Sequence, residues 1–338
     1  MGDTLVAAFG AALVVTVWLS VLRTVFIPGE TSSRVARWTA RALAGACLAA
    51  ARRLPRPAAR KVLDFCAPLS LFAVVGVWLG GLLIGSALIA AALAPGSGPE
   101  HLLDAFQRGA ASTAIGLAAL VSAVLVLVAF AVYLVQFTNA YAHREREVTR
   151  MAVEVPTLAD ADRKLGICLE STPREKVDDR FAHWAEWLAD VRGAHLSYPA
   201  LLYARPAGTL SWPSAVIIAM DVAAVVQAVA PTWAPGRTSL LIEHGSACVQ
   251  RMAEQVGITL PATTVSLQGR EEFIFNDTVR LAVHAGLFEE RDRSETWNDF
   301  QRIRGRYAPY AMAVNHRLMY EVHERISIPA RAVDRSMS

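Results

Sequence analysis

Residues Ala118 to Thr138, AALVSAVLVLVAFAVYLVQFT, form the stretch of sequence that decides the fold. This stretch carries no charged side chain, and its length of about 21 residues is what an α-helix needs to cross a hydrocarbon layer of ~30 Å. It leads directly into Asn139 to Glu147, NAYAHRERE, where an aromatic side chain precedes basic ones. Tyrosine is typical of the headgroup layer, and arginine of the cytoplasmic side of a membrane. The pattern therefore predicts a transmembrane helix that ends near residue 138 and is followed by a soluble domain.

The composition of the whole chain agrees with a membrane protein. The 338 residues are 54% hydrophobic and only 19% charged, and the mean hydropathy is +0.34. A soluble protein of this length normally carries more charge. The net charge of +3 is too small to predict binding to nucleic acid. The lipid bilayer is thus the partner that we expect, and nucleic acid is not.

Two further apolar stretches, at about residues 5–27 and 68–94, have the length of a membrane span. Asp3 stands where a cleavable signal peptide has basic residues, so we expect the first stretch to stay in the chain. The second stretch contains glycines at spacings that let a neighbouring helix approach closely in lipid, namely Gly76, Gly80, Gly81 and Gly85. Glycine is also common in membrane helices in general, so the spacing alone leaves the contact open.

The segment between these stretches, Pro28–Leu63, is basic, with eight Lys or Arg residues against one acid. Helical periodicity from Val35 to Leu54 has two interpretations. The helix could lie on the surface of an anionic leaflet, or it could be a cytoplasmic helix that packs on the C-terminal domain. Because basic loops stay on the cytoplasmic side, the charges predict an external N-terminus and a cytoplasmic C-terminal domain.

Between the second and third spans, Glu100 to Leu117 begins polar and ends apolar. It is too short and too polar for an independent span, because Asp104 and Arg108 would then lie in lipid. We expect a re-entrant half-helix at about residues 101–113. Asp104 and Arg108 are four residues apart, so they either pair with each other or line an external vestibule.

The remaining chain has helical periodicity at about residues 176–192, 213–230, 239–256, 270–285 and 294–325, with polar, loop-like residues at 156–174. It has no sustained alternation of the kind that strands show, which predicts an all-α domain. Residues 213–230 are apolar nearly all round, but Asp221 lies among them, so we interpret them as the buried central helix of a bundle. The predicted division is a membrane domain at residues 1–150 and a cytoplasmic helical domain at residues 151–338.

Three stretches carry a resemblance to a known group of proteins: Leu63–Ile89, Asp104–Thr138 and Trp184–Pro206, the last reading WAEWLADVRGAHLSYPALLYARP. The chain resembles bacterial, mainly actinobacterial, membrane proteins of the potassium channel family, which are two-helix pore-loop channels. This resemblance implies an inner-membrane location, a homo-oligomer (a tetramer if it conducts) and monovalent cations as the permeant species.

The resemblance also assigns the pore constriction. A potassium filter needs consecutive backbone carbonyls that point into the pore, and its glycines allow that backbone. The residues at the equivalent place are Ser112, Thr113, Ala114, Ile115, Gly116 and Leu117. Gly116 matches the first filter glycine, but no second glycine and no aspartate follow. A degenerate filter of this kind implies poor selectivity, unless these residues belong to an unbroken helix.

Other candidate sites lie in the C-terminal domain. Asp221 is a carboxylate within an apolar helix and needs a partner, either His195 or an arginine. His195, Tyr198 and Asp221 are therefore candidate ligand-binding residues, with a structural ion pair as the alternative for Asp221. None of the common nucleophile, phosphate-binding or zinc motifs occurs, so we expect no catalytic residue, no metal and no cofactor. Two functions remain: a cation channel gated or assembled through its cytoplasmic helices, or a non-conducting membrane-anchored sensor or scaffold.

Overall fold

The computed structural model describes residues 2–27, 34–93, 114–155, 161–170, 173–258 and 270–320. All regular elements in these residues are helical, which confirms the all-α class. The chain divides into two compact units. Unit 1 comprises Met1–Tyr141 with Ala194–Arg205, and unit 2 comprises Ala142–Gly193 with Pro206–Ser338. The division thus falls nine residues earlier than residue 150, and unit 1 also takes in a short segment from the C-terminal half.

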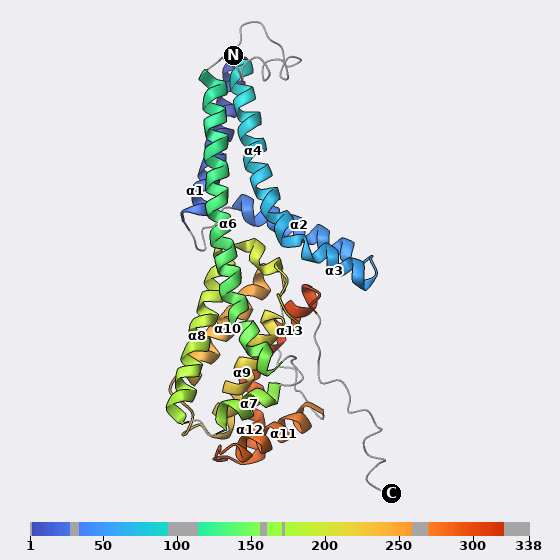
Figure 1. Cartoon of the computed structure of the whole chain (residues 1–338), viewed down its shortest axis with the longest axis vertical. Helices are drawn as coiled ribbons and strands as arrows, with labels where there is room; N and C mark the ends of the chain where they lie inside the picture. The colour runs from blue at the N-terminus through green and yellow to red at the C-terminus, as the bar shows by residue number, and fades with distance from the viewer. Residues whose placement is uncertain are drawn as a thin grey trace. The chain divides into compact units, whose positions relative to one another are not determined.

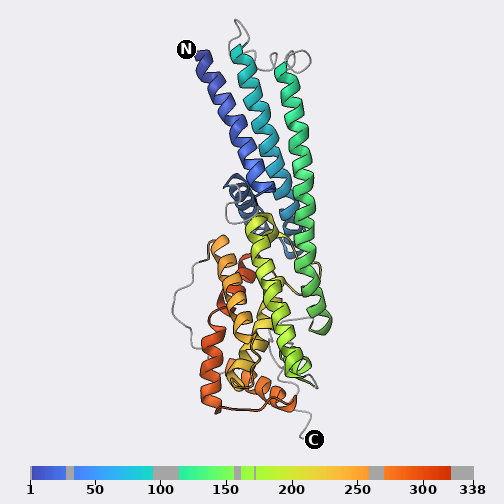
Figure 2. The same cartoon turned by 90° about the vertical axis from the view of Figure 1, so that its left-hand side faces the viewer.

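Long apolar helices make up most of unit 1. They are α1 (Gly2–Val25), α4 (Cys66–Leu93) and the first part of α6 (Ala114–Glu154), and they run side by side (Figures 1 and 2). All three are long and apolar enough to cross a membrane. In the most apolar 18-residue segment of each helix, at most 28% of the segment is buried within the protein. This confirms a multi-pass membrane protein by length and composition.

Helices α1 and α4 pack closely through small residues. A Cβ atom built on Gly10 of α1 would lie 2.7 Å from the carbonyl oxygen of Gly85 on α4, and one built on Gly81 would lie 2.7 Å from Val17. A Cβ on Gly76 or on Gly80 would meet nothing within 4 Å. Two of the four glycines in the sequence pattern therefore form the helix contact, and the other two do not.

One face of α6 packs into unit 1, and the rest of its apolar part stays exposed. The buried face consists of Val126, Ala129, Tyr133 and Phe137, at the spacing of one helix face. Phe130 lies beside Phe72 of α4, with ring centroids 6.3 Å apart. Large apolar side chains such as Leu120, Val124 and Val128 are about half exposed. This pattern is that of a helix whose outer surface faces lipid or other apolar partners.

Helices α2 (Arg34–Ala51) and α3 (Arg56–Asp64) form a hairpin that projects sideways from the long helices of unit 1 (Figure 1). Helix α2 ends three residues earlier than expected, since Leu54 precedes Pro55 and a residue before proline avoids helical dihedrals. The segment Pro199–Tyr203, a short 3₁₀ helix named η3, packs against α2 and α4.

Unit 2 is built around α9 (Trp212–Val229). Helices α7 (Ala161–Leu169), α10 (Thr238–Gln255), α12 (Arg293–Arg304) and α13 (Ala308–Arg317) all contact α9. Helix α8 (Arg174–Ser197) has its first part in unit 2, and α11 (Arg270–His284) packs on α7. By length and hydropathy α9 also counts as a candidate span, but 89% of it is buried within the protein. This degree of burial is that of a core helix, as the sequence predicted.

Two expectations for the C-terminal half were wrong. Residues 156–174 were expected to be loop-like, yet Ala161–Leu169 form α7, because Leu165, Cys168 and Leu169 make a buried stripe. The helix expected at 294–325 is broken between α12 and α13. Gly305 follows the last turn of α12, and proline occupies the first turn of α13, which is a common way for one helix to end and another to begin.

Candidate functional site

The described part of the expected filter is helical. Ala114, Ile115, Gly116 and Leu117 form the first turn of α6, which continues without interruption to Glu154. Carbonyl groups in a helix accept hydrogen bonds from residues four positions later, so they are not free to line a pore. The other candidates for the filter and the vestibule lie outside the described residues: Ser112, Thr113, Asp104 and Arg108.

Asp221 has an arginine and a tyrosine as partners, and both come from unit 2. Its carboxylate accepts a hydrogen bond of 3.1 Å from Nε of Arg304 and another from the hydroxyl of Tyr307. Burial and the neighbouring carboxylate raise the pKa of Tyr307 well above 10, so this hydroxyl remains a donor. These contacts support the structural alternative for Asp221, in which an ion pair joins α9 to α12.

His195 and Tyr198 belong to unit 1, whereas Asp221 belongs to unit 2. His195 is fully buried. The Tyr198 hydroxyl donates a hydrogen bond of 3.2 Å to the side chain of Gln136 on α6, and its ring lies 5.4 Å from that of Tyr133. Burial raises the pKa of Tyr198. Tyr198 thus joins the end of α8 to α6, and its hydroxyl is already used within the protein.

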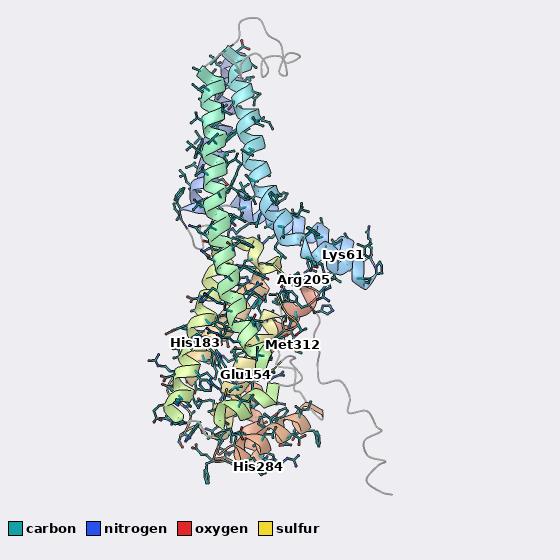
Figure 3. All side chains as sticks on the ribbon, in the orientation of Figure 1. Lys61, Glu154, His183, Arg205, His284 and Met312 are labelled. Atoms are coloured by element: carbon teal, nitrogen blue, oxygen red, sulfur yellow. The ribbon has the colours of Figure 1, made fainter. Side chains whose placement is uncertain are left out.

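Among the described residues of unit 2, charged side chains on the last part of α6 form a buried cluster. Arg144, Glu145 and Glu147 are all buried, although their sequence is that of an exposed membrane edge. Glu147 accepts a hydrogen bond of 3.1 Å from Nε1 of Trp184, and it lies 3.1 Å from Nε2 of His183. Trp184 and His183 both belong to α8. We call the contacts between α6 and α8 the α6–α8 polar interface, and Figure 3 labels His183 on it.

Further ion pairs extend this interface. Glu145 accepts from Arg144 at 2.9 Å and from the backbone amide of Ala207 at 2.9 Å. His143 of α6 lies 3.1 Å from Asp190 of α8. At the end of α6, Glu154 pairs with Lys164 of α7, whose ammonium group also lies over the ring of Trp184. Because each buried charge has a partner of opposite charge or a backbone donor, the interface holds α6 in a defined orientation in unit 2.

Sequence reasoning missed this interface because the charges of residues 143–150 suggested only a cytoplasmic edge. A signal for it was present. Val148, Met151 and Val155 recur at helical spacing after residue 138, and Arg144 lies on the same face one turn earlier. All four are buried. An apolar stripe that continues beyond a membrane span predicts that the helix itself continues into the next domain.

The described residues contain no group of three or more His, Cys, Asp or Glu side chains that could hold a metal ion. No family model matches the chain, and neither a curated protein nor a solved structure gives a match.

Proposed function

We propose that the chain is an inner-membrane protein with three spans, α1, α4 and α6, whose N-terminus is external and whose unit 2 lies in the cytoplasm. Support comes from the sparse burial of these three helices and from the dense burial of α9, which marks α9 as part of a soluble core. The orientation rests on the basic segment between α1 and α4 and on the basic residues after Thr138, because such residues stay on the cytoplasmic side.

Within this topology, the geometry supports a non-conducting, membrane-anchored sensor or scaffold best. The observation that carries this proposal is the continuity of α6 from Ala114 to Glu154. One helix starts among the filter candidates, carries the most apolar stretch of the chain and ends in the α6–α8 polar interface. A rigid helix fixed by buried ion pairs passes a rotation or a shift on to the residues that hold it. Unit 2 would then present a surface for partners or respond to movement of α6.

A second candidate is a cation channel, and the resemblance in Leu63–Ile89 and Asp104–Thr138 favours it. In such a channel the constriction would come from residues before Ala114, with α6 lining the axis of a homotetramer. The two candidates differ in one measurable property, which is ion conduction.

The experiment is ion flux in proteoliposomes that contain the purified full-length protein, with empty liposomes as baseline and an added ionophore as positive control. The sensor or scaffold proposal expects no potassium or sodium flux above that of empty liposomes, at any gradient or voltage. Flux above that baseline would overturn it, and flux that Thr113→Val abolishes would establish a channel whose constriction lies before Ala114. The variant Leu120→Ile, at an exposed position of α6, controls for general effects of substitution in this helix.

A further inference from the structure

The hairpin of α2 and α3 has a free face of mixed chemistry. The buried side of α2 recurs at helical spacing and consists mostly of small residues: Ala36, Ala40, Ala44, Cys47 and Ala51, together with Leu48. On the opposite side, Trp38 is 76% exposed, which is unusual for the largest apolar side chain. Arg41, Gly45 and Ala49 continue this exposed side at intervals of three or four residues. The free face therefore presents an aromatic ring, an arginine and bare backbone together.

The charge of the hairpin is strongly one-sided. Residues 34–65 contain eight Lys or Arg and a single acid, Asp64. Asp64 lies 3.8 Å from Arg205, so this acid has a partner of its own. No ion pair among the described residues includes the exposed basic side chains of the hairpin, which are Arg41, Arg52, Arg53, Arg60 and Lys61. The described residues of unit 1 thus leave this positive charge uncompensated.

The position of the hairpin in the chain adds a second constraint. It follows the end of α1 and precedes the start of α4, so it lies where two candidate spans end on the same side. Figures 1 and 3 show it directed away from the long helices of unit 1 and across their direction, with Lys61 on α3. Exposed apolar side chains border its base, including Phe65 and Leu69. A helix at this level, crosswise to the spans, runs along a membrane surface.

We propose that the α2–α3 hairpin binds anionic phospholipid headgroups of the leaflet at which α1 ends and α4 begins. Phosphate groups compensate the free Arg and Lys side chains, and Trp38 occupies the interfacial layer, where an amphipathic ring is stable. The exposed tryptophan favours a lipid surface over an acidic protein segment, because such a segment would need only the charges. The proposal rests on α1 and α4 crossing the membrane, and it holds whether or not the chain conducts ions.

The test measures which lipids the full-length protein retains in detergent. The protein is offered an equal mixture of phosphatidylglycerol and phosphatidylcholine, and native mass spectrometry then counts the bound molecules of each lipid. The variant is Arg41→Gln/Arg52→Gln/Arg53→Gln. The control is Lys176→Gln/Arg192→Gln/Arg317→Gln, which removes the same charge from exposed positions of unit 2. Each basic side chain near an anionic surface contributes about a fivefold gain in binding. We therefore expect a loss of about a hundredfold in phosphatidylglycerol binding for the hairpin variant, and no loss for the control.

A second readout locates the contact. Lipids brominated near the headgroup quench a tryptophan that lies in the interface, and the difference between wild type and Trp38→Phe isolates Trp38. We expect quenching of Trp38 that increases with the anionic fraction of the bilayer. Equal retention of both lipids by wild type, an equal loss in hairpin and control variants, or an unquenched Trp38 would each overturn the proposal. A protein that fails to enter vesicles at all would instead refute the three-span topology, so the two failures are distinguishable.

Discussion

Glu147 offers the sharpest test of the α6–α8 polar interface. Its carboxylate is 10% exposed and contacts His183 at 3.1 Å, and it accepts a hydrogen bond of 3.1 Å from the buried indole of Trp184. Glu147→Gln keeps the shape and one acceptor oxygen but removes the charge. A hydrogen bond to a charged acceptor contributes about 1.5–3 kcal/mol, and a neutral one about 0.5–1.5 kcal/mol. Since the side chain of His183 is 53% exposed, its contact with Glu147 contributes little to the free energy of unfolding. We therefore expect Glu147→Gln to lower the free energy of unfolding by about 1.5 kcal/mol.

Glu147→Ala should cost more, about 3 kcal/mol, because it also leaves the indole N–H of Trp184 buried without an acceptor. The assay is thermal unfolding of the full-length protein in detergent, followed by near-UV circular dichroism, which reports packing around tryptophans. For a unit of this size, 1 kcal/mol shifts Tm by about 2–4 °C. The glutamine variant should then melt about 3–6 °C lower than wild type, and the alanine variant about 6–12 °C lower.

The matched control is Glu186→Gln on α8, where the side chain is exposed and makes no hydrogen bond among the described residues. It should change Tm by less than about 1 °C, since surface substitutions cost little. A double-mutant cycle of Glu147→Gln with Trp184→Phe should give a coupling energy of about 1 kcal/mol. Additive effects in this cycle, or equal shifts for Glu147→Ala and Glu186→Gln, would refute the inference that Glu147 fixes α6 in unit 2.

Three further outcomes follow from other contacts. Gly85→Leu should destabilise unit 1 in thermal unfolding by about 2 kcal/mol, because even a Cβ atom would lie 2.9 Å from the carbonyl oxygen of Gly10. A Cβ atom on Gly76 would meet nothing within 4 Å, so Gly76→Leu should be neutral, and equal losses would contradict this helix contact. Asp221→Asn should cost about 2 kcal/mol in unfolding free energy, since it weakens the bonds from α12 and from the Tyr307 hydroxyl, and an unchanged value would show that they contribute nothing. Hydrogen bonds from Thr232 and Trp233 hold the pKa of Glu290 below its usual value of 4.5. The stability that this carboxylate provides is therefore present above pH 4.5 and is lost as the pH falls through its lower folded-state pKa. Between about pH 6 and pH 3, the Tm of Glu290→Gln should thus fall less than that of wild type, and parallel curves would contradict this assignment.

The membrane helices and the core helix of unit 2 were predictable from sequence because each depends on a local property. A run of some 20 apolar residues requires burial in lipid or in a protein core, wherever the rest of the chain lies. Asp221 and the flanking prolines were enough to assign residues 213–230 to a protein core, and the burial of α9 agrees with this. The breaks at Leu54 and at Gly305 also have local causes that the sequence contains.

The pairing of side chains was not predictable in the same way. Asp221 needed a partner by the physics of burial, but only the fold selected Arg304 and Tyr307, which lie 83 and 86 residues further along the chain. The glycines of α4 are alike in sequence, and only the packing of α1 separates Gly81 and Gly85, which form a contact, from Gly76 and Gly80, which do not.

Sequence alone thus determined the class of this protein: an all-α chain with several helices long and apolar enough to span a membrane, and with a basic segment between the first two of them. Tertiary structure decided which polar groups are used. It placed Glu147 against Trp184 and His183, and among the described residues it left the exposed basic side chains of the α2–α3 hairpin without an ion pair. The reason is physical, because hydrophobic burial is roughly proportional to the apolar area of each segment, whereas a hydrogen bond or an ion pair forms only between atoms that the complete fold brings together.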